Sequence, residues 1–418
     1  MSTLIALRKH SSAELRQGVT LAASSPRELL ATPSLSPEFA AVLTGLGFKP
    51  CTRNEPVDAR SATFLHLNAL DAYIISTPDE RQTEQARATF DEDTYHLALD
   101  IPLALSAPIR ASRVNRRGRP VPWPEVSGIR YAHRNGITGE GVLVGVLDTG
   151  CDADHLELRK KRIPFQYIPL HSLQTPQRDI RGFDAVGHGT HVCGILAGKH
   201  VGVAPGAALL VVSVIESETL QTSLSRIVLG LDWLFMQFSA AENSGKPAIV
   251  NMSLGYLPKH IDKQHLHAGM AVIQQILSTF LARGILPIVA IGNEGPGTLC
   301  APGYFPETLS VGAVDFQHEP AGFSGGGNAP VSGETQPNIA GYGVGILSSF
   351  GRDMNNRSFY ARMDGTSMAT PYVAGIAALY ASADATLKGE ALRQHLLNTA
   401  LPLQAPEERV GAGLARFL

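Results

Sequence analysis

The chain alternates short apolar runs with amphipathic stretches over most of its length. In the larger, C-terminal part, five apolar runs end in glycine or polar residues: residues 141–150, 207–216, 246–255, 285–295 and 308–315. Helical patterns lie between several of these runs, at residues 223–245 and 263–284. Continuous apolar runs that alternate with helices are typical of a parallel sheet covered on both faces. The pattern therefore predicts an α/β fold, with functional groups at the carboxyl ends of the strands.

A smaller region with a different pattern precedes this one. Residues 64–77 and 94–105 alternate and cluster apolar residues like strands, and residues 77–90 between them resemble a helix after a Thr-Pro start. Residues 106–124 are rich in Arg and Pro and lack apolar periodicity, which is typical of a linker. We therefore divide the chain into a small α+β domain, a linker and a large α/β domain: residues 1–112, 113–124 and 125–418.

Composition excludes some classes of function. A chain of 418 residues with 44% hydrophobic residues can bury a sizeable core, and its formal charge of −2 gives no basic field for nucleic acid or an anionic membrane. The apolar start stops at Arg8 and Lys9, too early for a signal peptide, and no later run approaches a membrane span. We expect a cytoplasmic protein with no nucleic-acid or membrane partner. The four cysteines are widely spaced and predict neither a zinc site nor a disulfide framework.

Three motifs carry residues suited to acyl transfer. VGVLDTGCDADH contains Asp148, GHGTHVCGILAG contains His188, and DGTSMATPYVAG contains Ser367. Acyl transfer needs a hydroxyl nucleophile, an imidazole that takes its proton, and a carboxylate that orients the imidazole. Each residue alone has an ordinary alternative, as a turn-forming Asp, a loop His or a helix-capping Ser. Three such residues in separate long motifs favour catalysis over coincidence.

These motifs resemble those of the subtilisin-like serine proteases, from about Val121 to the C-terminus. The chain order Asp, His, Ser is that of subtilisin. The resemblance implies a subtilisin-like parallel sheet and a serine endopeptidase without a cofactor, with Ser367 as nucleophile, His188 as base and Asp148 as the orienting carboxylate. The segment VAIGNEG resembles the family's oxyanion strand, which implies that the Asn293 side chain and the Ser367 amide donate to the oxyanion.

The same resemblance implies residues that bind a peptide or protein substrate. NMSLGY contains Ser253, Leu254 and Gly255 and resembles the strand that pairs with an extended substrate. Cys300 aligns with a glycine that many relatives carry at the back of the first specificity pocket. A side chain there would make the pocket shallower and favour small or medium apolar residues before the cut. The alternative is a buried thiol that acts as a small hydrophobe.

The chain also departs from many relatives. After HVCGILAG it continues KHVGVAPGA, without the longer loop that binds calcium in many secreted relatives. Lys199 and His200 offer no side-chain oxygen to a hard cation, so we expect no strong metal site. Cys151 and Cys193 lie in the Asp and His motifs, where we expect them to pack, and we expect His191 to be structural.

The N-terminal domain resembles the family's inhibitory propeptides in position, size and α+β pattern. This implies a zymogen whose own N-terminal domain is its inhibitor, with the segment near Ser112 in the substrate groove until the Arg-rich linker is cut. The alternative for this domain is a permanent accessory or partner-binding role. For the whole chain, the alternatives are a catalytically silent peptide-binding protein and a processing enzyme dedicated to one partner.

Overall fold

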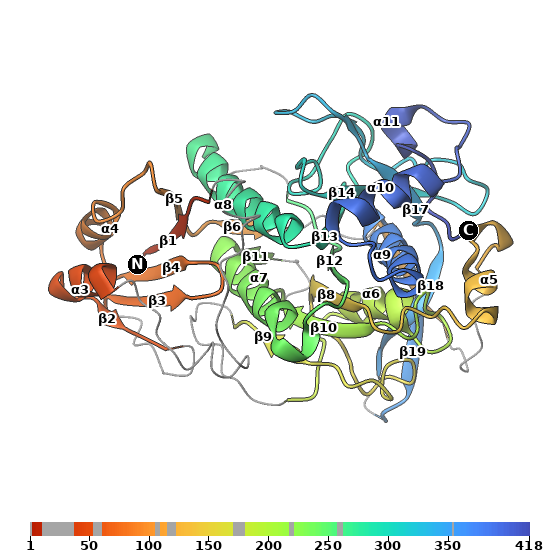
Figure 1. Cartoon of the computed structure of the whole chain (residues 1–418), viewed down its shortest axis with the longest axis horizontal. Helices are drawn as coiled ribbons and strands as arrows, with labels where there is room; N and C mark the ends of the chain where they lie inside the picture. Colours follow the sequence, from red (N-terminus) through yellow and green to blue (C-terminus); the bar gives the residue numbers. More distant parts are fainter. Residues whose placement is uncertain are drawn as a thin grey trace.

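The computed structural model describes residues 2–10, 37–52, 61–104, 109–114, 123–169, 180–216, 221–256, 262–352 and 355–418. Within them, a seven-stranded parallel sheet forms the centre of the larger domain, in the order β17-β14-β13-β12-β8-β10-β9 (Figure 1). Its strands are β8 (Leu143–Asp148), β9 (Phe165–Tyr167), β10 (Ala208–Ser213), β12 (Ala248–Met252), β13 (Ile285–Ala290), β14 (Leu309–Val314) and β17 (Ile339–Tyr342). The predicted α/β fold with a parallel sheet is confirmed.

Helices cover both faces of this sheet because its strands bury side chains on both sides. In β8, Val144 and Val146 join one apolar cluster, whereas Leu143 and Leu147 join another. The longer helices of the first cluster are α5 (Ile129–Arg134), α6 (His188–Ala197), α9 (Thr366–Ala383) and α10 (Gly389–Thr399). Those of the second are α7 (Leu224–Ser239) and α8 (Lys263–Ala282). None of the helices in the described ranges is long and apolar enough to span a bilayer.

A separate five-stranded sheet lies at the N-terminal end, in the order β2-β3-β4-β1-β5. Its elements are β1 (Ser2–Arg8), α3 (Pro37–Gly45), β2 (Lys49–Pro50), β3 (Thr63–Leu67), β4 (Ala72–Thr77), α4 (Glu80–Arg87) and β5 (Tyr95–Leu99). One face packs on α7 and α8, which lie between the two sheets in Figure 1. Asp100 fastens the junction, because its carboxylate accepts hydrogen bonds from the Ser225 amide (2.8 Å) and hydroxyl (2.7 Å).

Short strands and helices complete the described structure. β6 (Pro102–Ala104) pairs with β11 (Gln221–Ser223), and β7 (Arg110–Val114) pairs with β19 (Ser358–Asp364), whose other neighbour is β18 (Ile346–Arg352). The remaining elements are η1 (Glu125–Ser127), η2 (Ala241–Asn243), β15 (Gly327–Asn328), β16 (Thr335–Gln336) and α11 (Glu407–Val410). Of the expected linker, residues 113 and 114 belong to β7, and residues 115–122 lie outside the described ranges.

Candidate active site

The carboxyl end of β8 and the start of α6 bring Asp148 and His188 together. Asp148 is the last residue of its strand, and His188 is the first residue of its helix. Asp148 Oδ1 lies 2.7 Å from His188 Nδ1 and also accepts the Thr149 amide at 2.7 Å. Both side chains are buried, and within the described residues His188 Nε2 has no hydrogen-bond partner. The carboxylate therefore orients the ring and leaves Nε2 available for a proton.

The two histidines of the motif differ in their pKa. Burial alone would lower the pKa of His188, but the charge of Asp148 and its hydrogen bond, together with the charge of Asp184, raise it overall. Burial lowers the pKa of His191 to about 3, and its Nε2 lies 3.0 Å from the Ala361 carbonyl oxygen. His191 is thus neutral near pH 7 and anchors α6 to β19, which fits the structural role expected for it.

The start of α6 packs on the loop after Asp148 with no room for a side chain. A Cβ atom at Gly189 would lie 2.1 Å from the Gly150 carbonyl oxygen and 3.1 Å from Asp148 Oδ1. Gly189 instead presents its amide, which donates to Thr149 Oγ1 at 2.8 Å. The position of the predicted base relative to its carboxylate therefore depends on this close backbone contact.

Asp184 holds the N-terminus of α6, a role that the sequence motifs did not suggest. Its carboxylate accepts the amides of Gly187 and Thr190, both at 2.8 Å, and the Thr149 hydroxyl at 2.9 Å. The Gly187 amide lies just before the first turn of α6 and the Thr190 amide lies within it, where amides have no intrahelical acceptor. Gly187 is the N-cap residue of α6 and has no side chain, so Asp184, three residues earlier, accepts these amides instead. The sequence carries no capping residue at the helix start that would signal this role.

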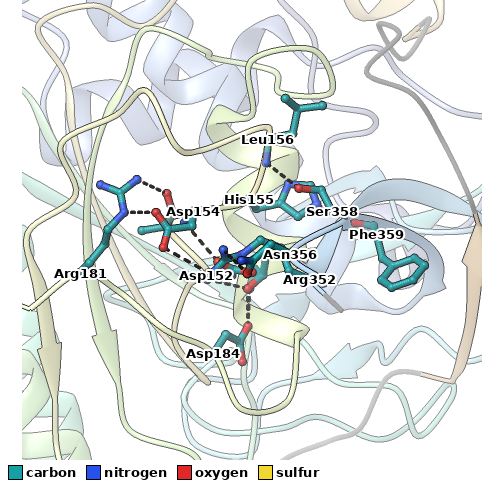
Figure 2. Close-up of polar contacts among 12 residues, drawn as sticks. Asp152, Asp154, His155, Leu156, Arg181, Asp184, Arg352, Asn356, Ser358 and Phe359 are labelled. Atoms are coloured by element: carbon teal, nitrogen blue, oxygen red, sulfur yellow. Dashed lines mark hydrogen bonds and ion pairs between the residues drawn. The ribbon is translucent and has the colours of Figure 1, made fainter. Parts of the chain in front are cut away.

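A network of hydrogen bonds and ion pairs connects Asp184 with the loop after β8 (Figure 2). Thr190 Oγ1 donates to Asp184 at 2.6 Å and accepts the Asp152 amide at 2.9 Å. Arg352 Nε lies 3.0 Å from the Asp152 carboxylate, and its Nη2 lies 3.3 Å from Asp154. Arg181 also pairs with Asp154. The network ties the loop that follows Asp148 to β18.

Ser367 is the second residue of α9. Its hydroxyl donates to the Ser253 carbonyl oxygen at 3.1 Å, so it is turned toward the predicted substrate strand in this structure. The amides in the first turn of a helix lack intrahelical acceptors, and the helix dipole favours negative charge there. This location suits an oxygen that becomes anionic.

Asn293 lies beside the same helix start. Its Oδ1 accepts the Thr366 amide at 2.8 Å and the Thr366 hydroxyl at 3.0 Å. With the amide oxygen held in this way, Nδ2 remains the donor end of the side chain. A Cβ atom at Gly365 would lie 3.5 Å from Nδ2, so the donor is next to the segment that carries Ser367. The predicted oxyanion donor is therefore placed near the predicted nucleophile.

Cys300 fills the space between the ends of β12 and β13. A Cβ atom at Gly255 would lie 2.6 Å from Cys300 Cβ, and one at Gly292 would lie 2.5 Å from its Sγ. The buried thiol donates to Glu294 Oε2 at 3.2 Å, and the same oxygen accepts the Asn293 amide at 2.8 Å. Cys300 thus lies beside Gly255 and is linked to Asn293 through the Glu294 carboxylate. The sequence motifs did not single out Glu294.

Leu254 and Ser253 follow β12 and are buried. Leu254 belongs to the apolar cluster of α7 and α8, whereas the Ser253 carbonyl oxygen faces Ser367. The predicted substrate strand Ser253–Gly255 thus runs from the nucleophile toward Cys300.

Cys151 and Cys193 are buried free thiols in the first apolar cluster. The hydrogen bond of Cys193 with Cys151, together with burial, raises the pKa of Cys193.

The structure places the segment near Ser112 beside β19. Ser112 lies in β7 opposite Arg362, rather than along the predicted substrate strand. The strand near the Asp148 side of the site is β6, which pairs antiparallel with β11. Thr222 of β11 donates to the Val214 carbonyl oxygen at 2.6 Å, and the Val214 amide donates to the Asp148 carbonyl oxygen at 2.9 Å. A short apolar strand, rather than the polar linker, therefore approaches the site from this side.

A buried carboxylate holds the loop after α6. Glu157 Oε2 accepts the His200 amide at 2.6 Å and the Val201 amide at 3.3 Å, and Oε1 accepts the Tyr360 hydroxyl at 2.7 Å. In the part of the chain that the structure describes, no three His, Cys, Asp or Glu side chains form a group able to hold a metal ion. Hydrogen bonds between protein groups fasten this loop.

The larger domain is similar to known proteases. Residues 139–413 match the model of the subtilase family. The chain is 42% identical over 375 residues to the subtilisin-like protease PopC of Myxococcus xanthus, covering 87% of this chain and 78% of that protein. It is 34% identical over 290 residues to subtilisin Savinase of Lederbergia lenta, covering 68% of this chain and 92% of that protein. A solved cold adapted subtilisin-like serine proteinase has a TM-score of 0.53 at 26% identity, covering 67% of this chain and 90% of that one.

Proposed function

Because the chain belongs to the subtilase family and is a subtilisin-like serine protease, we propose that it is an endopeptidase that forms an acyl-enzyme on Ser367. We further propose that it is made as an inhibited precursor. The observation that carries the first proposal is the buried 2.7 Å contact between His188 Nδ1 and Asp148 Oδ1, with His188 Nε2 left without a partner among the described residues. An imidazole held in this way is a general base.

The reaction starts with a rotation of the Ser367 hydroxyl away from the Ser253 carbonyl oxygen. His188 Nε2 takes the hydroxyl proton as Oγ attacks the substrate carbonyl carbon, and Asp148 stabilises the imidazolium that results. The oxyanion accepts hydrogen bonds from Asn293 Nδ2 and from the Ser367 amide. His188 then gives the proton to the leaving amine, the C–N bond breaks, and an ester remains on Ser367. Water hydrolyses this ester with His188 again acting as base.

The substrate binds as an extended strand along Ser253–Gly255, so that recognition is mainly of its main chain. Cys300 occupies the space beside Gly255, where its side chain limits the depth of the pocket for the residue before the cut. Small or medium apolar side chains therefore fit better there than large aromatic ones.

The pairing of β6 with β11 supports inhibition by the N-terminal domain. Leu103 of β6 is buried and shares an apolar cluster with Leu224 and with Leu254, the central residue of the predicted substrate strand. Because the tail is tethered, its effective concentration at the site reaches the millimolar range, so even modest affinity would block a substrate. A cut after β6 followed by release of the domain would then activate the enzyme.

A fluorophosphonate probe tests the proposed nucleophile, since it reacts only with an activated serine. We expect the matured wild-type protein to be labelled on Ser367 and Ser367→Ala to remain unlabelled and folded. Wild-type protein that stays unlabelled after loss of the N-terminal domain would instead favour a silent peptide-binding protein. The masses of both proteins over time test the precursor: wild type should shorten and gain activity, and Ser367→Ala should stay intact unless another protease cuts it.

A further inference from the structure

We propose that the edge of β19 that lies opposite Ser112–Val114, together with the apolar cluster around Val114, is a binding site for substrate residues several positions after the scissile bond. In this proposal, β7 is the chain's own ligand for that edge. The proposal rests on the proposed endopeptidase function. It extends peptide recognition beyond Ser253–Gly255, to a strip of main chain on the other side of the nucleophile.

The strip begins next to Ser367. The Ile109 amide donates to the carbonyl oxygen of Asp364 at 2.9 Å, and Asp364 precedes Ser367 by three residues. From there β7 runs antiparallel to β19, from Arg110 opposite Asp364 to Val114 opposite Tyr360. The described residues give β19 two neighbours, β18 and β7, so removal of β7 would expose a row of unpaired main-chain groups. Such an edge accepts an extended peptide as an added strand.

The chain passes from one side of the predicted site to the other between β6 and β7. β6 lies on the Asp148 side of the site, at β11, and the chain then reaches Asp364 at Ile109. The five Cα–Cα steps between Ala104 and Ile109 can span at most roughly 18 Å. One short extended peptide can therefore contact both edges, with its earlier residues on β11 and its later residues on β19.

The far end of the strip has a side-chain site as well as main-chain groups. Val114 packs against an apolar cluster of Val201, Leu347 and Tyr360. The Tyr360 hydroxyl donates to Glu157, the buried carboxylate that also holds the loop containing Val201. The strip therefore favours an apolar side chain several residues after the cut. Ser112, two residues earlier in β7, is exposed and adds no such contact.

This arrangement gives the enzyme a second block that is independent of β6. Release of the N-terminal domain by a cut between β6 and β7 would free β11, whereas β7 would remain attached to the larger domain and cover β19. A substrate with a long segment after its scissile bond must then displace β7, but a substrate with a short one need not. Weakening β7 should thus affect long substrates selectively.

A pair of charge-matched variants tests this in the active enzyme. Val114→Asp removes the apolar contact of β7, and Ser112→Asp adds the same charge to the same strand at an exposed position. The substrates are two quenched peptides with identical residues before the cut and either two or six residues after it. The measured quantity is kcat/KM for the long substrate divided by kcat/KM for the short one. We expect Val114→Asp to raise this ratio at least tenfold and Ser112→Asp to leave it as in wild type. Because β6 affects both substrates alike, its contribution cancels in the ratio. An equal ratio in all three proteins would overturn the proposal.

Binding to the inactive protein separates this proposal from the proposed function. In the Ser367→Ala background, a fluorescent hexapeptide with the sequence of residues 109–114 should bind at least tenfold more tightly when Val114→Asp is added than when Ser112→Asp is added. Equal Kd values, or no binding to either, would refute a peptide site on β19 even if the enzyme cleaves peptides. Conversely, tighter binding without any cleavage would refute the endopeptidase but retain the site. If Val114→Asp fails to fold, Val114→Ser replaces it in both experiments.

Discussion

Truncation of Leu103 tests whether β6 inhibits the enzyme. The side chain is 1% exposed and lies in the apolar cluster of Leu224 and Leu254. A buried Leu→Ala change costs about 2–5 kcal/mol, because it removes transfer free energy and leaves a cavity. If about 2 kcal/mol of binding free energy is lost and the loss affects only the docking of the tail, the affinity of the tail for the site falls by roughly 30-fold. The open fraction of an otherwise blocked precursor should rise by the same factor.

The assay is the initial rate of peptide hydrolysis by freshly purified full-length protein, with mass spectrometry to verify that the chain is intact. Leu103→Ala should start about 30-fold faster than wild type and reach the same final rate after maturation. Leu46→Ala is the matched control, because it makes the same truncation in the N-terminal domain at a side chain that is 39% exposed. If intact Leu103→Ala and intact wild type start at the same rate, the proposed inhibition through β6 is wrong.

Further changes address the site itself. Gly189→Ala places a Cβ atom 2.1 Å from the Gly150 carbonyl oxygen, so steady-state kinetics should show a loss of about 10²-fold in kcat from displacement of the base. Asn293→Ala should lower kcat by about 10²–10³-fold at nearly constant KM, a magnitude known from subtilisin itself rather than worked from this structure. Because the pKa of His188 is raised from 6.5 and the base must be neutral, kcat/KM should rise with pH through a midpoint above 6.5. Cys300→Gly should extend cleavage after small residues to cleavage after Phe and Tyr, as measured on a peptide library.

Five of the seven strands of the central sheet could be predicted because their pattern is local, whereas the short strands β9 and β17 are not among the predicted runs. These five strands lie in runs dominated by apolar residues, and a strand buried on two faces can be recognised from such a run without knowledge of its neighbours. The triad motifs are local too, since each places one functional residue at a strand or helix end. The contacts that hold these motifs in place join residues that are far apart in the sequence. Glu157 and Tyr360 are 203 residues apart in the sequence, and Arg352 and Asp152 are 200 residues apart, so nothing in either segment indicates the contact.

The N-terminal tail shows a different limit. Residues 106–124 resemble a linker because Arg and Pro interrupt every apolar period, yet Arg110–Val114 form a strand in the structure. β7 is held by main-chain hydrogen bonds to β19 and by the packing of Val114. β6 has only three residues, one of which is a deeply buried leucine. β6 is too short for a periodic signal, and the residues Arg-Ala-Ser-Arg-Val of β7 do not alternate apolar with polar side chains.

Main-chain hydrogen bonding also makes the edges of β11 and β19 suitable for binding substrates. A ladder that depends on amides and carbonyls accepts almost any extended sequence, and it gains selectivity only where a side chain enters a pocket. At the two proposed edges, the apolar clusters that hold Leu103 and Val114 would supply this selectivity. A substrate that matches both would displace the tail more readily than one that matches either, because the two contacts lie on one connected peptide and reinforce each other. Selectivity in this enzyme should therefore depend on residues far from the scissile bond as much as on the residue beside Cys300.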